Sequence, residues 1–283
     1  MFFLKKRNSK VSLGSQKVNL TMHNKEYLLL VQEGHLTRSA LIGGLNSIRK
    51  SNIDDNSRGL FYSGLFELAT GFERLMKIVY ILDYKINNDF KNPSDNQLKK
   101  LSHDTKSLFG KCAGLALKYN LKNELILNEH QTKILDVLSS FGRVSRYYNL
   151  IELANNNNET DPISQWLDVI DDHVWELRND VRERLQQIAL SQGQTDAWCQ
   201  HINGEPITTI DFHYYMLTTE KANPHIIWSI IDMLRPFYSL LHEQVRILHD
   251  KWNHEKSIPF MYEFFPFFLT HKHVVLKRKQ WAL

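Results

Sequence analysis

Hydrophobic residues recur at helical spacing along much of the chain. The segment from Gly59 to Lys85 places large apolar side chains at intervals of three and four residues, which is the period of an amphipathic helix. The same spacing predicts a helix from about Leu36 to Arg49. Two more helices are predicted, one carrying Leu98 through Tyr119 and one carrying Ile134 through Tyr148. Four consecutive helices favour an antiparallel bundle, which we place at residues 35–153.

The segments on either side of this predicted bundle have different patterns. Residues 1–34 combine alternation with an apolar run, so we expect short strands there. Residues 154–162 are rich in asparagine and predict a linker. After the linker, residues 163–283 are expected to form a second helical module.

The predicted second module mixes helices with one hairpin. A helix is expected from Ile163 to about Leu190, with one apolar side and one charged, solvated side. The pair Asn203-Gly204 lies between β-branched and aromatic residues, which predicts a hairpin near residues 198–215 closed by a type I′ turn. A last long helix is expected to begin with Asn223 as N-cap and to end near Trp252.

The expected fold class is therefore mainly α: an antiparallel helical bundle joined to a second helical module with one small β-hairpin. Within the last long helix, the proline at position 236 is expected to produce a kink, because it removes a backbone hydrogen bond.

Composition narrows the class of protein only slightly. The 283 residues are 42% hydrophobic and 23% charged, with a net charge of +4, which is ordinary for a globular protein and compatible with an anionic partner. The two cysteines, Cys112 and Cys199, lie far apart and predict neither a disulfide framework nor a zinc knuckle. No run reaches 18 apolar residues, so we expect no membrane span and a cytoplasmic location.

Motifs of several enzyme classes are absent from the sequence. There is no glycine-rich phosphate loop, no GxSxG elbow and no HExxH motif, which argues against nucleotide hydrolases, α/β-hydrolases and zincins. The nearest histidine clusters, His249 with His254 and His271 with His273, lack the same-face spacing of a helical metal pair. We therefore expect no metal site and no cofactor.

The segment "SSFGRVSRYYNLIEL" at residues 139–153 holds the densest candidate chemistry. On a continuous helix Tyr148 would face the core, whereas Arg143, Arg146 and Tyr147 would project outwards. Guanidinium groups bind phosphate and aromatic rings stack on unpaired bases, so this face could bind RNA. The same residue types also suit a dimer interface. In a third interpretation the arginines only pair with acids of the second helix, Glu67 or Glu73.

Three successive segments resemble the HEPN family of small helical-bundle proteins. "ELATGFERLMKIVYIL" resembles its second helix, which bears glutamate and lysine; "LKKLSHDTKSL" resembles its His-Asp segment; and "SRYYNL" resembles its closing Arg-Tyr-Pro. The resemblance implies an all-α bundle, often dimeric, that occurs in prokaryotic toxin–antitoxin and anti-phage defence systems. It further implies RNA as substrate and a metal-independent endoribonuclease or a degenerate relative; the alternative is a non-catalytic helical interaction subunit.

In active members of that family, four to six residues stand between an arginine and the histidine that follows it. No histidine follows Arg143 or Arg146 at that spacing, whereas Arg235 and His242 stand at it in the second module. These two residues, together with His103 of the His-Asp segment, are the catalytic candidates. A structural role of His103, beside a helix cap at Ser102 or Asp104, is the alternative.

Overall fold

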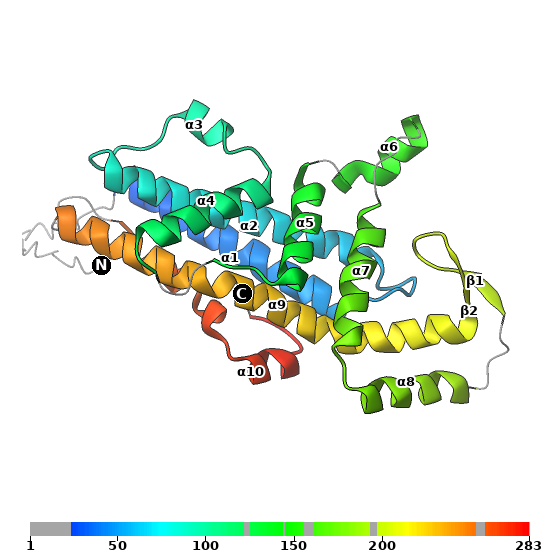
Figure 1. Ribbon diagram of the computed structural model, residues 1–283. Helices are drawn as coiled ribbons and strands as arrows, with labels where there is room; N and C mark the ends of the chain where they lie inside the picture. The colour runs from blue at the N-terminus through cyan, green and yellow to red at the C-terminus, as the bar shows by residue number, and fades with distance from the viewer. Residues whose placement is uncertain are drawn as a thin grey trace, which may run out of the picture.

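The computed structural model describes residues 24–121, 125–143, 145–155, 161–192, 197–252 and 258–282. Within them the chain is mainly α-helical, and one small antiparallel sheet accompanies the helices (Figure 1), which confirms the predicted fold class. The helices are α1 (Lys25–Lys50), α2 (Gly59–Asn87), α3 (Asp95–Lys99), α4 (Thr105–Lys118), α5 (Glu129–Arg143), α6 (Tyr148–Asn155), α7 (Pro162–Trp175), α8 (Asn179–Ser191), α9 (Thr209–Trp252) and α10 (Lys272–Lys277). The shorter elements are the 3-10 helices η1 (Ser145–Tyr147), η2 (Met261–Phe264) and η3 (Pro266–Leu269) and the strands β1 (Trp198–Gln200) and β2 (Pro206–Thr208).

Helices α1 and α2 form a tightly packed pair. A Cβ atom on Gly71 would lie 2.7 Å from the side chain of Leu41 and 3.0 Å from its backbone nitrogen. A Cβ on Gly44 would lie 2.6 Å from the side chain of Leu68, and one on Gly64 would lie 2.7 Å from Ile48. These glycines therefore set how closely the two helices approach.

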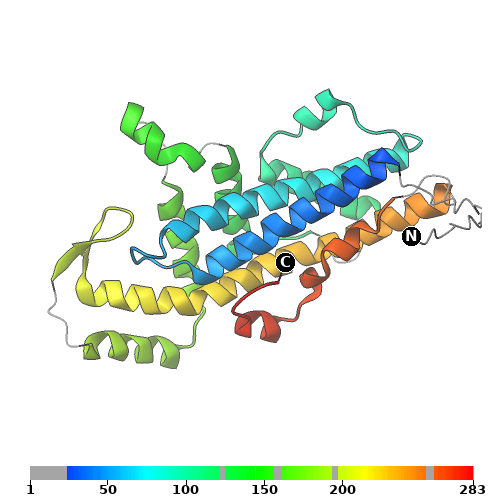
Figure 2. The ribbon, with the colours of Figure 1, turned by 180° about the vertical axis from the view of Figure 1, so that it is seen from behind.

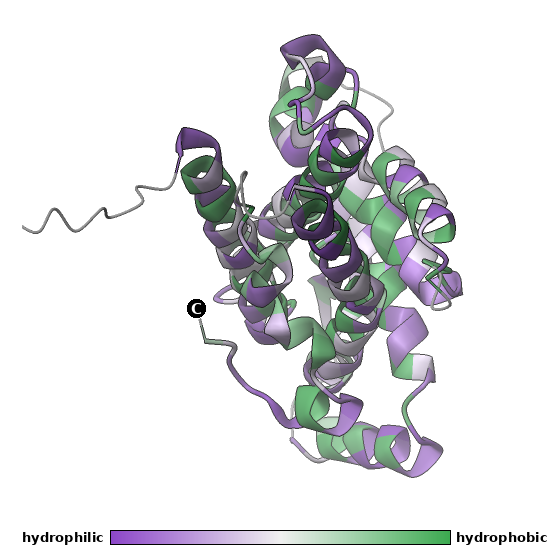
Figure 3. Cartoon of the chain, turned by 90° about the vertical axis from the view of Figure 1, so that its left-hand side faces the viewer, coloured by the Kyte–Doolittle hydropathy of each residue, from purple (hydrophilic) through white to green (hydrophobic). Residues whose placement is uncertain are grey.

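The long helix α9 runs beside this pair and joins both halves of the chain into one core. Figures 1 and 2 show α9 alongside α1 and α2 from opposite sides of the molecule. Its buried residues, among them Ile230, Phe237 and Leu241, belong to the same hydrophobic cluster as Phe72 of α2 and Trp166 of α7. Each long helix carries hydrophobic and hydrophilic residues side by side (Figure 3). The linker predicted at residues 154–162 thus does not separate two hydrophobic cores.

Two expected boundaries differ from the structure. Residues 25–34 form the first turns of α1 and not strands, because Asn24 caps the helix by accepting a hydrogen bond from the backbone of Tyr27; residues 1–23 lie outside the described part. The last long helix begins at Thr209 and continues through Pro224 and Pro236. Asn223 is buried and donates from its side chain to the carbonyl of Ser51 at 2.8 Å, so tertiary packing overrides the local start signal.

Three of the predicted helices are interrupted. The third divides into α3 and α4, where Ser102 adopts a positive φ of 56°. The fourth divides into α5, η1 and α6, and the helix expected from Ile163 to Leu190 divides into α7 and α8. Asp161 caps α7 and Pro162 occupies its first turn, as the Asp-Pro signal indicates.

The hairpin is present, but its turn is of another type. The strands pair between residues 198 and 208, and residues 209–215 belong to α9. The amide of Gly204 donates to the carbonyl of His201 at 2.9 Å, and only the glycine of the Asn203-Gly204 pair has a positive φ, of 89°. A type I′ turn needs positive φ at both central residues, so this loop is the three-residue kind that ends in a bulge glycine.

The C-terminal segment folds back onto α1 and α9. The side-chain amide of Asn46 binds both backbone groups of Trp281, accepting from its N–H at 2.7 Å and donating to its carbonyl at 3.0 Å. Trp281 itself is buried. Cys112 is buried and Cys199 is half-buried. No helix in the described ranges has both the length and the apolar character that crossing a membrane requires.

Replacing Gly71 by alanine tests the close approach of α1 and α2. The new methyl group would overlap Leu41, including its backbone, so we expect a loss of about 1–3 kcal/mol in the free energy of unfolding, measured by urea denaturation. The matched control is Gly114→Ala on α4, where a Cβ meets nothing within 4 Å and helix propensity should add about 0.5–1 kcal/mol. Equal stability of the two variants would contradict the packing argument.

Candidate nucleic-acid interface at the junction of α2, α4 and α5

The turn between α3 and α4 presents His103 at the surface. Asp104 is the N-cap of α4, since its side chain accepts a hydrogen bond from the backbone of Ser107 at 2.9 Å. His103 therefore precedes the cap and lies outside the helix. Its side chain is 65% exposed, so it is accessible to a ligand.

Glu73 of α2 holds the ring of His103. The Nδ1 atom of His103 lies 2.9 Å from Glu73 Oε2, and Lys77 Nζ lies 2.6 Å from Glu73 Oε1. Burial opposes ionisation of Glu73, but the hydrogen bonds from Lys77 and His103 outweigh it and lower its pKa. A carboxylate accepts hydrogen bonds only, so Nδ1 carries the ring proton and Nε2 is the nitrogen able to accept another.

Asp104 links the same turn to the end of α5. Its Oδ1 accepts from Ser139 Oγ at 2.9 Å, and its Oδ2 lies 3.8 Å from Arg143 Nη1. The backbone hydrogen bond from Ser107, followed by those from Ser139 and the charge of Arg143, lowers the pKa of Asp104 against a smaller opposing effect of burial. A Cβ on Gly142 would lie only 3.3 Å from the carbonyl oxygen of His103, which places His103 directly beside the last turn of α5.

The remaining candidates of this segment continue along the surface. Arg143 and Arg146 are exposed, Tyr147 is 55% exposed, and the Arg146 guanidinium lies 5.1 Å from the centre of the Tyr147 ring. Tyr148, expected in the core, is only half-buried because the helix is interrupted before it.

The expected pairing of these arginines with Glu67 or Glu73 is not what the structure has. Glu73 binds Lys77 and His103, Glu67 accepts a hydrogen bond from Ser47, and Arg143 pairs with Asp104. A weak pair at 3.8 Å leaves a half-exposed guanidinium able to bind a phosphate.

The structure does not bring Arg235 and His242 together with these residues. Both lie on α9, about 10.5 Å apart along its axis because His242 stands seven positions after Arg235. Arg235 donates to the carbonyl of Thr270 at 2.9 Å, and the ring of His242 lies 4.8 Å from that of Tyr262. Both side chains thus contact the returning C-terminal segment.

Four side chains at the junction can act together chemically. His103 can accept or donate a proton, Glu73 fixes its tautomer, and Arg143 and Arg146 can neutralise phosphate charge. The sequence alone could have suggested Glu73, because Glu73 and Lys77 stand at the i, i+4 spacing of a helical ion pair. In the portion of the chain that the structure describes, no group of three histidine, cysteine or acidic side chains is placed to hold a metal ion; His254 lies outside that portion.

Neither a protein-family model, a curated protein nor a solved structure matches this chain at a significant level.

The lowered pKa of Glu73 predicts a dependence of stability on pH. A carboxyl group whose pKa is lower in the folded than in the unfolded state stabilises the fold above its unfolded pKa, and this contribution is lost as the pH falls through the folded pKa. The native protein should therefore exceed Glu73→Gln in free energy of unfolding at about pH 7, and the difference should shrink below about pH 4.5. Urea denaturation over this range measures it. Glu220→Gln, at an exposed position of α9, controls for the loss of one carboxylate, and a pH-independent difference would contradict the assignment.

Proposed function

We propose that this chain is an HEPN-like protein that engages RNA at the junction of α2, α4 and α5. It would act as a metal-independent endoribonuclease, or as a catalytically degenerate relative, in a prokaryotic defence or toxin–antitoxin system. One observation carries the proposal: an exposed histidine whose Nδ1 is fixed by Glu73 lies beside the turn that bears Arg143.

The proposed chemistry needs no metal ion. His103 Nε2 takes the proton of a ribose 2′-hydroxyl, and the resulting oxygen attacks the adjacent phosphorus. The bond from phosphorus to the 5′-oxygen breaks, that oxygen takes a proton from water, and a 2′,3′-cyclic phosphate remains. Arg143 neutralises the negative charge that accumulates on the phosphoryl oxygens.

Arg146 and Tyr147 supply the binding surface next to this centre. A guanidinium group binds phosphate oxygens in a bidentate manner, and an exposed tyrosine ring stacks on an unpaired base. Their exposure and their position immediately after α5 support a single-stranded RNA ligand.

The resemblance to the HEPN family supports the same region. Glu73 comes from the first of the three resembling segments, His103 from the second, and Arg146 with Tyr147 from the third. A hydrogen bond joins Glu73 of the first segment to His103 of the second. The third segment lies on η1 and α6, which follow α5 in the chain. This chain departs from the family pattern because its histidine precedes the arginines in sequence, so the degenerate relative stays part of the proposal.

Incubation with total RNA tests the proposal. The native protein should bind RNA and release fragments ending in cyclic phosphate, whereas His103→Gln should bind but not cleave. Arg143→Ala/Arg146→Ala should weaken binding several-fold and reduce the slope of log Kd against log salt concentration by about 1 to 1.5, because two phosphate contacts are lost. Arg178→Ala/Arg184→Ala on the α8 side matches the change of charge and should behave as native. Absence of cleavage together with unchanged RNA binding in the double variant would refute the proposal.

A second function, a non-catalytic interaction subunit, is favoured by the exposed apolar residues of α6. Leu150 is 66% exposed and Leu153 is 86% exposed, three residues apart on one side of a short helix. Single leucines at the surface are common, but two neighbours beside exposed Tyr147 form a contact face suited to another helix.

Light scattering tests this second function in the form of a homodimer. The native protein should have twice the mass of one chain, and Leu150→Asn/Leu153→Asn should have the mass of a single chain because its contact face is polar. Leu117→Asn, at a 58% exposed position of α4, is the control and should keep the mass of the native protein. A native protein with the mass of one chain would contradict the homodimer.

A further inference from the structure

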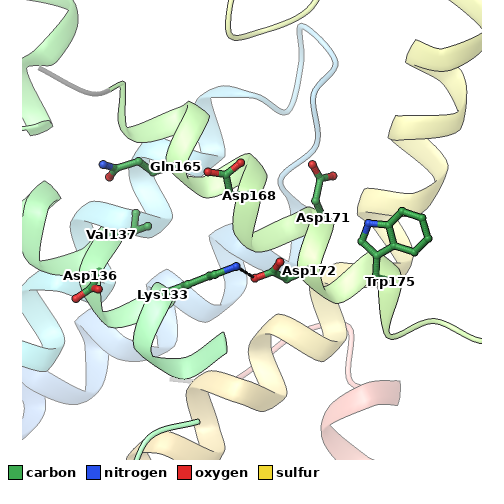
Figure 4. Close-up of a pocket in the computed structure, with 8 residues that line it drawn as sticks. All are labelled: Lys133, Asp136, Val137, Gln165, Asp168, Asp171, Asp172 and Trp175. Carbon is green, nitrogen blue, oxygen red and sulfur yellow. Dashed lines mark hydrogen bonds and ion pairs between the residues drawn. The ribbon is translucent and has the colours of Figure 1, made fainter. Parts of the chain in front are cut away.

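A groove lined by hydrogen-bond acceptors follows one side of α7. Its first hollow, between α5 and α7, has a volume of about 430 Å³, and its second, between α7 and the hairpin, has a volume of about 310 Å³. The two hollows share Gln165, Asp168 and Asp171 as lining residues, so they adjoin along α7. Figure 4 shows the side chains of the first hollow and their origin on the two helices.

Carboxylates dominate this groove. Five of them line it: Asp136, Asp168, Asp171, Asp172 and Glu205. The one lysine among the lining residues of both hollows, Lys133, is already engaged, because its Nζ lies 2.6 Å from Asp172. The groove therefore carries excess negative charge and disfavours an anionic ligand.

In the second hollow, His201 has a ring nitrogen that lacks a hydrogen-bond donor among the described residues, and this observation is independent of the carboxylates. The side chain oxygen of Asn203 accepts a hydrogen bond from the backbone N–H of Glu205 at 3.1 Å, so the His201 Nδ1 atom, 3.0 Å from the same oxygen, must be the donor. The Nε2 atom then carries a lone pair. His201 is only 7% exposed, and its Nε2 has no hydrogen-bond partner within the described structure.

Gln165, which lines both hollows, also has a buried acceptor atom without a hydrogen-bond partner in the part of the chain that the structure describes. This atom is its side-chain oxygen. A buried acceptor without a partner costs free energy, and a ligand or an ordered water that donates a hydrogen bond to it removes this cost. Both unpartnered atoms are acceptors, and both need an N–H or O–H donor.

Asp171 is a partly buried carboxylate that a positive charge in the groove would stabilise. It accepts a hydrogen bond from the hydroxyl of Tyr215. Burial, assisted by the neighbouring Asp168, raises the pKa of Asp171 even though the Tyr215 hydrogen bond opposes the shift. A cation in the groove would compensate for this loss of hydration.

Trp175 closes the far end of the first hollow. Its indole is 73% exposed, and the guanidinium of Arg182 already lies 4.5 Å from the ring centre. Carboxylates beside an exposed aromatic ring are the usual surroundings of a bound organic cation.

We propose that the α7 groove binds an organic cation with several N–H donors, namely an alkyl ammonium or guanidinium group. Such a group supplies donors to His201 and Gln165 and charge to Asp168 and Asp171. Ten residues of helix separate Gln165 from Trp175, about 15 Å, so a linear cation with two or more charged groups would span the groove. This inference is independent of the RNA site, which uses other residues.

Two sources share this chemistry, a free polyamine and a lysine- or arginine-rich segment of a protein. Isothermal titration calorimetry with spermine and with an acetylated, amidated Arg-Gly-Arg peptide separates them. At least one probe should bind, and the tighter one identifies the source. Tetramethylammonium, which has charge but no N–H donor, should bind at least tenfold more weakly than spermine or the peptide.

Asp168→Asn is the critical variant, because Asp168 is exposed and its replacement should not affect folding. It should raise the Kd of the bound probe at least tenfold, and Gln165→Met, which removes the unpartnered oxygen but keeps the side-chain length, should raise it several-fold. The control is Asp95→Asn on α3, which removes the same charge far from the groove and should leave the Kd unchanged. The proposal is overturned if neither probe binds, if Asp168→Asn and Asp95→Asn give the same Kd, or if tetramethylammonium binds as tightly.

Discussion

The close approach of α1 and α2 is the constraint on which the rest of the molecule depends. Gly71 has no side chain, so both the side chain and the backbone of Leu41 pack directly against α2, and this contact restricts the rotation of α2 about its own axis. Two residues further on, Glu73 projects to roughly the opposite side of α2, because each residue turns the helix by about 100°. The contact between Gly71 and Leu41 therefore also orients α2 so that Glu73 points towards the start of α4. His103 is held there because α2 can present its carboxylate in only one direction.

Sequence patterns predicted the elements whose signals are both local and strong. The long apolar stripe of α2 gave its bounds to within two residues, and the Asp161-Pro162 signal gave the start of α7. The same type of signal failed at Asn223-Pro224, because burial of this turn against Ser51 outweighs a helix start that is favourable only locally. The fourth predicted helix holds no proline, so its helical periodicity alone predicted it as continuous, whereas the break at Ser102 agrees with the alternative of a helix cap at Ser102 or Asp104.

The sequence predicted properties of single residues at the candidate site, but it did not predict which of these residues contact one another. A helix cap beside His103 and the exposure of Arg143, Arg146 and Tyr147 followed from local rules, and the structure agrees with them. The pairing of His103 with Glu73 depends on how α2 and α4 pack, and thirty residues separate the two in the sequence. The groove along α7 could not be predicted from the sequence either, because it depends on how distant elements pack together. Three of its five carboxylates lie on one face of α7, as they would on a solvated helix surface, and only the hairpin and α5 make that face concave.

The two surfaces of opposite charge share helix α5, and this arrangement affects both. Asp136 lines the acidic groove, whereas Arg143 lies two turns further on, about 10.5 Å along the axis. The Debye length at physiological ionic strength is about 8 Å, so the carboxylates of the groove still act weakly on a phosphate bound near Arg143. If the proposed RNA site is occupied, they would repel a nucleic-acid chain that extends along α5 towards α7, and they would thereby favour a path over Arg146 and Tyr147. A cation in the proposed groove site would reduce this repulsion, so the path of a bound RNA chain would depend on the occupancy of the neighbouring acidic site.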